Sequence, residues 1–99
     1  MNEKEELRVP RKETFIWRKR PGDIIEVEGK TTHFLNPMGS RIWELINERH
    51  TVADIIRLIV EANNSPEKTE EGVRRQVKHY LDDLVKKGLI SYDTGVWDG

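Results

Sequence analysis

The chain has 99 residues, the usual size of one domain, which leaves room for a modest core and little for a deep catalytic cavity. Its 17 lysines and arginines nearly balance 18 aspartates and glutamates, so no overall field would draw it to nucleic acid or to an acidic membrane. Without cysteine it has no disulfide or thiolate chemistry, and no apolar stretch approaches the ~18 residues of a membrane span, so we expect a soluble cytoplasmic protein.

We expect both ends of the chain to lie outside the folded domain. Residues 1–13 are rich in charge, and Pro10 interrupts any helix there, so we expect a mobile N-terminal arm. The folded domain is expected over residues 14–92, and residues 93–99 should form a C-terminal tail. Trp97 in this tail either folds back on the sheet or is available to a partner, and the sequence leaves both alternatives open.

Three strands are expected before the first helix. The stretch "TFIWR", residues 14–18, is β-branched and aromatic and precedes a Pro-Gly turn. In "DIIEVEGKTTHFLN", residues 23–36, Gly29 suits the first central position of a two-residue turn that closes Glu28 on Thr31. This register pairs Val27 with Thr32 and Ile25 with Phe34 on the core face, and Glu26 with His33 and Ile24 with Leu35 on the other face.

Capping residues mark the starts of the first two helices. Asn36 can cap the first helix and Pro37 suits its first position, so the third strand should end in a sharp corner. This helix should end at "NERH", and Trp43 lies beside its apolar stripe and is expected in the core. Thr51 and Asp54 are spaced as a capping box for the second helix, which "NNSP" ends.

A third helix should run from about Thr69 to Lys87 and close at Gly88, with "LISY" as a short last strand. The order of elements predicts an α+β domain in which a three-stranded antiparallel sheet is followed by three helices on one of its faces. Such a cluster of helices beside a small sheet also resembles a winged helix-turn-helix.

We find no pattern that indicates catalysis or metal binding. The three histidines, His33, His50 and His79, lack the spacing of a zinc pair on a helix. A phosphate loop, a nucleophile elbow and a dinucleotide fingerprint are absent from the sequence, and capping and solubility explain the acidic residues. We therefore expect no catalytic residue, no metal and no cofactor.

The third helix carries two neighbouring stripes at helical spacing. One should face the core, and the other combines apolar side chains with two cations, while the opposite flank, with Gln76, Asp83 and Lys87, is polar. The mixed stripe either lines a groove for an apolar peptide with acidic residues or is the margin of a wide core stripe. The core stripe contains Val73, Val77, Tyr80 and Leu84, and the mixed stripe contains Arg74, Lys78, Leu81 and Val85.

The third strand should complete such a groove. If the strands lie side by side in chain order, this strand is at a sheet edge, with one row of backbone groups unpaired. An extended peptide could then add to the sheet along Thr31–Leu35 by β-augmentation.

Three motifs together closely resemble the PqqD family: "LNPMGSRIWELI", "TVADI" and "YLDDLVKKGLI". The resemblance covers about residues 17–90 and departs from the family in the loop 47–50, where many members have "DG". It implies a RiPP recognition element, which binds the leader of a ribosomally made precursor peptide and presents it to a modifying enzyme. That enzyme is often of the radical S-adenosylmethionine type. The implied peptide-binding residues are Thr31, Thr32, His33, Phe34 and Leu35 on the strand, and Arg74, Lys78, Leu81 and Val85 on the helix.

The main alternative is a winged-helix transcription regulator with its helix-turn-helix over residues 51–87. Arg74, Arg75 and Lys78 would then face DNA phosphates. The acidic start of the third helix and the net charge of −1 argue against it. A small enzyme or carrier is a third hypothesis, which the lack of a nucleophile or ligand cluster disfavours. We therefore expect a leader peptide and a modifying enzyme as partners, and neither nucleic acid nor membrane.

Overall fold

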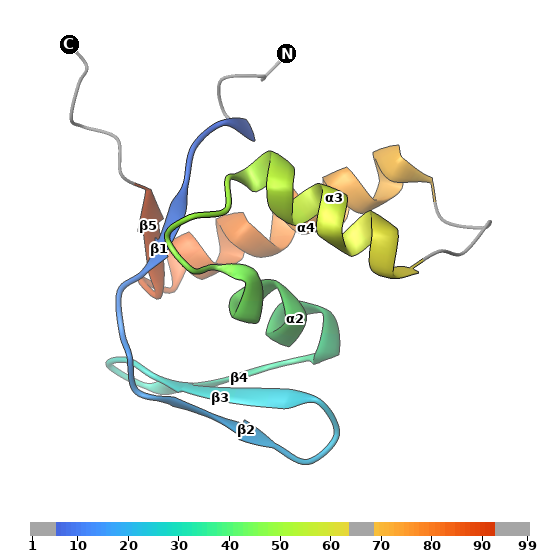
Figure 1. The fold of residues 1–99 in the computed structure, drawn as a ribbon. Helices are drawn as coiled ribbons and strands as arrows, with labels where there is room; N and C mark the ends of the chain where they lie inside the picture. Colours follow the sequence, from blue (N-terminus) through green and yellow to red (C-terminus); the bar gives the residue numbers. More distant parts are fainter. Residues whose placement is uncertain (1–5, 64–68, 93–99) are drawn as a thin grey trace, which may run out of the picture.

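The chain folds into a helical layer on one face of a small antiparallel sheet (Figure 1). This is seen in a computed structural model, which describes residues 6–63 and 69–92, so residues 1–5 and the predicted tail 93–99 lie outside the description. The predicted α+β class, with a three-stranded antiparallel sheet and three helices, is confirmed. The elements are β1 (Pro10–Lys12), β2 (Trp17–Arg20), β3 (Ile24–Glu28), β4 (Thr32–Leu35), α2 (Pro37–Leu45), α3 (Val52–Asn63), α4 (Glu70–Lys86) and β5 (Ile90–Tyr92).

Local chemistry starts and ends the helices as predicted. The side chain of Asn36 accepts a hydrogen bond from the Gly39 N–H, and Pro37 is the first residue of α2. Thr51 and Asp54 exchange hydrogen bonds as a capping box before α3. Beyond α4, Gly88 takes a positive φ of 74°, the left-handed conformation that ends a helix.

The core lies between the sheet and the three helices. Trp43 is fully buried there, as predicted, and meets Trp17 of β2 edge to face at a centroid distance of 6.2 Å. Among the described helices, none is long and apolar enough to cross a membrane. The buried apolar residues are Ile25, Val27, Leu35, Ile42, Trp43, Ile46, Val52, Ile55, Ile56, Ile59, Val73, Val77, Leu81, Leu84, Leu89 and Ile90.

The predicted register of the β3–β4 hairpin is wrong by one residue. The structure pairs Ile25 with Leu35 and Glu26 with Phe34, and three residues rather than two connect the strands. A slip of one residue exchanges the faces of a strand, so Leu35 is buried and Phe34, predicted in the core, is exposed.

The cause of this register is the helix that follows the hairpin. The buried hydroxyl of Ser40 in α2 accepts from the Ile25 N–H and donates to the Leu35 C=O, both at 2.9 Å. It therefore holds these two residues opposite each other. Nothing in the hairpin sequence alone reveals this tertiary contact.

The predicted N-terminal arm is also wrong for the part that the structure describes. Pro10, Arg11 and Lys12 form β1 and pair with Tyr92, Ser91 and Ile90 of β5. The Lys12 ammonium donates to the Ile46 C=O at 2.6 Å and lies about 5 Å from the centroids of the Trp17 and Trp43 rings. Burial lowers the pKa of Lys12. These contacts make the segment part of the fold.

Candidate functional site

Strand β4 has one open edge. The sheet order is β2-β3-β4, and within residues 6–63 and 69–92 no strand pairs with the far side of β4. The Glu28 N–H bonds to the Ile16 C=O on the β2 side, so Val27 and Ile25 direct their backbone groups to β4. Their partners are His33 and Leu35.

The same alternation identifies the unpaired backbone groups of β4. Because His33 and Leu35 turn their N–H and C=O groups to β3, Thr32 and Phe34 turn theirs to the open edge. The hydrogen bond from the Gly29 N–H to the Thr31 C=O fits the same alternation, because Thr31, like His33 and Leu35, turns its carbonyl toward the neighbouring strand and away from the open edge. The edge therefore offers two N–H and two C=O groups to an incoming strand.

The C-terminal part of α4 lies alongside β4. At one end of the strand, Asn36 donates from Nδ2 to the Tyr80 hydroxyl at 2.8 Å. At the other end, a β-carbon on Gly29 would lie 3.2 Å from Leu89 Cδ2, just beyond α4. The strand and the stretch from Tyr80 to Leu89 therefore run side by side in opposite directions.

The flank of α4 that faces β4 is not the predicted one. Tyr80 reaches the end of β4, and Lys78 lies about 160° from it around the helix. Three side chains lie on the same flank as Tyr80 and form what we call the near flank with it: Gln76, Asp83 and Lys87. Asp83 and Lys87 form an ion pair at 2.6 Å, so they largely neutralise each other.

The predicted cations of the groove hold the N-terminal segment instead. Arg74 Nε lies 2.8 Å and Lys78 Nζ 2.9 Å from Glu6 Oε2. The hydrogen bond from Lys78 is the largest of several causes that lower the pKa of the Glu6 carboxyl, and Arg74 adds to the effect. Both cations are therefore engaged away from β4.

The two apolar residues of the predicted stripe differ from each other. Leu81 is 1% exposed and belongs to the core, whereas Val85 is 40% exposed. Leu81 instead takes the place in the core that was predicted for Tyr80, which is only partly buried. The structure thus brings Thr31–Leu35 to the edge and places Arg74, Lys78, Leu81 and Val85 on the flank beside the N-terminal segment.

Helical periodicity could not place the near flank beside β4, because a helical wheel separates the flanks of a helix but does not show which one meets a given strand. The link between Asn36 and Tyr80 spans 44 positions and decides the question. The sequence signal that could have found it is the lone tyrosine in a stripe of aliphatic residues, because a buried tyrosine usually seeks a partner for its hydroxyl.

The cations required by the DNA-binding alternative are also engaged. Arg74 contacts Glu70 at 3.3 Å in addition to Glu6, and Lys78 contacts Glu6. Of the three cations in that hypothesis, Arg75 alone forms no ion pair with a described residue. One unpaired cation is a weak basis for binding a phosphate backbone.

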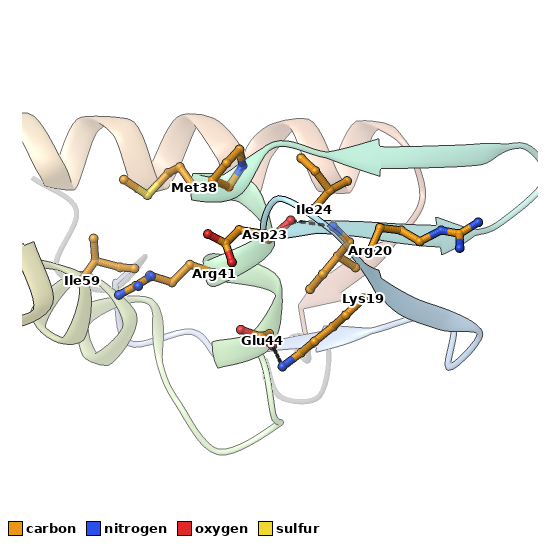
Figure 2. Close-up of a pocket in the computed structure, with 11 residues that line it drawn as sticks. Lys19, Arg20, Asp23, Ile24, Met38, Arg41, Glu44 and Ile59 are labelled. Carbon is orange, nitrogen blue, oxygen red and sulfur yellow. Dashed lines mark hydrogen bonds and ion pairs between the residues drawn. The ribbon is translucent and has the colours of Figure 1, made fainter.

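A hollow of about 460 Å³ opens beneath the β2–β3 turn (Figure 2). Its floor is apolar, with Ile24, Met38 and Ile59, and Lys19 on its rim lies 2.7 Å from Glu44 of α2. The hydroxyl of Ser40, which also lines it, is occupied by the backbone of the hairpin. Asp23 and Arg41 also line the hollow, which therefore presents charged side chains and no activated nucleophile among its lining residues.

The described residues also lack a metal site. In the part of the chain that the structure describes, no three histidine, aspartate or glutamate side chains gather closely enough to hold a metal ion. His33 lies near the open edge, where its ring hydrogen-bonds with the Thr31 hydroxyl at 3.1 Å.

A protein-family model matches most of the folded domain. The family model described as "Coenzyme PQQ synthesis protein D (PqqD)" matches residues 24–90. This range contains the whole β3–β4 hairpin and the three helices. No curated protein and no solved structure matches the chain significantly.

Proposed function

Because the chain belongs to the PqqD family, whose model covers more than half of it, we propose that it is a binding module for the leader of a ribosomally made precursor peptide. Members of this family are accessory proteins without catalytic activity of their own. In this proposal the module presents the bound precursor to a modifying enzyme of the radical S-adenosylmethionine type, in the cytoplasm. The module itself uses no metal or cofactor.

The open edge of β4 carries the proposal. A leader that adds a strand here meets the unpaired N–H and C=O groups of Thr32 and Phe34. About four main-chain hydrogen bonds, at ~0.5 to 1.5 kcal/mol net each, contribute ~2 to 6 kcal/mol. Ordering a disordered leader costs ~2 to 5 kcal/mol. The gain from main-chain hydrogen bonds and the cost of ordering the leader therefore nearly cancel in free energy, and side-chain contacts must supply most of the affinity.

Some side chains of the added strand lie on the helix-covered face of the sheet, next to α4. They point toward α4, where the near flank with Tyr80 takes the place of the stripe predicted from the sequence. The partly buried ring of Tyr80 is the apolar surface of this flank, and Asp83 and Lys87 pair with each other beside it. An apolar leader residue that faces α4 would therefore pack against Tyr80. We therefore assign peptide binding to Thr31–Leu35 and the near flank.

Titration of the isotope-labelled chain with a synthetic leader tests the proposal. The neighbouring genes are first searched for a short precursor, its leader is synthesised, and amide NMR shifts are recorded. We expect the largest shifts at Thr32–Leu35 and at Tyr80–Lys87. Shifts that gather around residues 48–53 and spare Thr32–Leu35 would place binding elsewhere.

A further inference from the structure

We infer that Phe34 forms a second recognition point, on the outer face of the sheet, for an apolar or aromatic side chain of the bound peptide. The inference rests on the proposed function, because it concerns a strand added to β4. It specifies the class of peptide: one with two adjacent apolar residues, of which one faces α4 and the next faces outward beside Phe34.

The first observation is the position of the Phe34 ring. Phe34 pairs with Glu26 and points away from the helices, and its side chain is 65% exposed. The three helices lie on the other face of the sheet, so no described element covers the ring (Figure 1). A large exposed aromatic residue on an edge strand is unusual, because edges commonly carry charge or are covered.

The second observation is what lies on each side of the ring. On the β3 side, Glu26 is held by the Arg20 guanidinium at 2.7 Å, and its side chain is largely covered. On this side Phe34 therefore lies next to a polar ion pair whose two charges neutralise each other. On the other side lies the open edge, where a further strand would place its own side chain. Of the two sides of the Phe34 ring, only the side toward the open edge can receive an apolar side chain.

The backbone geometry then fixes which peptide residue meets the ring. Phe34 directs its N–H and C=O groups to the open edge, so in a peptide strand added antiparallel to β4 the residue that bonds to both groups lies directly opposite. Residues opposite each other in a sheet share a face, with their β-carbons ~4.5 to 5.5 Å apart. The side chain of that residue must therefore lie against Phe34 on the outer face.

Neighbouring residues of the peptide point to opposite faces. The residue before or after the one beside Phe34 therefore faces the near flank of α4, where the partly buried ring of Tyr80 offers a contact to an apolar side chain. Together the two contacts select an adjacent apolar pair. A peptide in which the two apolar residues are separated by one polar residue fills only one of the two positions at a time.

Two capped hexapeptides of the same composition test this directly. They are Ac-Thr-Thr-Leu-Phe-Thr-Thr-amide, with an adjacent apolar pair, and its isomer Ac-Thr-Leu-Thr-Phe-Thr-Thr-amide. Each is titrated at millimolar concentration into the full labelled chain and followed by amide NMR. We expect the first to bind about 10-fold more tightly, equivalent to ~1.4 kcal/mol, with the largest shifts at Thr32–Leu35.

Variants of the chain complete the experiment. Phe34→Ser should abolish the preference for the first peptide, and Phe34→Leu should retain most of it. Phe15→Ser is the matched control, because Phe15 is 78% exposed but lies outside β4, and this variant should keep the full preference. Because both side chains are highly exposed, neither substitution should unfold the domain, and the spectra of the free variants check this.

Each other outcome overturns a distinct claim. Equal affinity of the two peptides, or a preference that survives Phe34→Ser, refutes the role of Phe34 and leaves leader binding at the edge intact. If both peptides leave Thr32–Leu35 unshifted, the edge does not accept a strand and the proposed function fails with the inference. If the wild type dimerises through Phe34 and the peptides do not compete, the ring serves a second copy of the chain and the inference is wrong.

Discussion

Replacing Thr32 with proline should weaken leader binding without breaking the fold. The Thr32 N–H points to the open edge and takes no part in the ladder with β3. Proline is tolerated at such edge positions, since the bond that it removes is one to solvent. The substitution therefore acts on the added strand and leaves the hairpin in place.

The size of the effect follows from the missing bond. A net hydrogen bond of ~0.5 to 1.5 kcal/mol corresponds to a rise in Kd of about 2- to 13-fold. The proline ring also projects toward the incoming backbone and keeps the neighbouring bonds long. We therefore expect the upper part of this range, a loss of about 10-fold.

The assay is fluorescence anisotropy with a labelled synthetic leader, and thermal unfolding checks the fold of each variant. Lys19→Pro is the matched control, because Lys19 lies on the opposite edge of the same sheet, in β2, and its N–H is likewise directed outward. Unchanged affinity in a folded Thr32→Pro variant, or an equal loss in Lys19→Pro, would refute β-augmentation on β4.

The remaining predictions concern stability, measured by urea denaturation. Leu81→Ala should cost ~2 to 5 kcal/mol because its side chain is buried, whereas Val85→Ala should cost less than about 1 kcal/mol. Ser40→Ala should cost ~1 to 3 kcal/mol, since two buried backbone groups lose their partner; a neutral result would remove the cause given for the register. Glu6→Gln should cost ~0.5 to 1 kcal/mol at pH 7. Because the folded pKa of Glu6 is lowered, this stabilisation is present above its unfolded pKa and is lost as the pH falls through the folded value; a pH-independent difference would contradict it.

Capping and helix ends were predictable because they depend on residues a few positions apart. Asn36, Thr51 and Gly88 each act on backbone groups of their own turn, and all three behave as predicted. The α+β class followed from the same local signals. It did not require knowledge of any contact between distant residues.

The errors all involve contacts between distant parts of the chain. The hairpin register depends on Ser40, and the strand formed by residues 10–12 depends on a partner near residue 91. The orientation of α4 depends on the link from Asn36 to Tyr80. Periodicity determines which residues share a face, but the surface that each face meets follows from the packing of the whole domain.

The pairing of β1 with β5 has a consequence for protein engineering. Pro10 and Tyr92 lie opposite each other in this ribbon, ~5 Å apart, and the chain continues before Pro10 to Glu6, which two cations of α4 hold. The first and last described segments of the domain therefore lie on the same side of it (Figure 1). A domain with adjacent ends can be placed in a surface loop of a host enzyme without stretching the host. A short glycine linker across this ribbon should likewise permit circular permutation, with new ends in the exposed turn at Pro21 and Gly22.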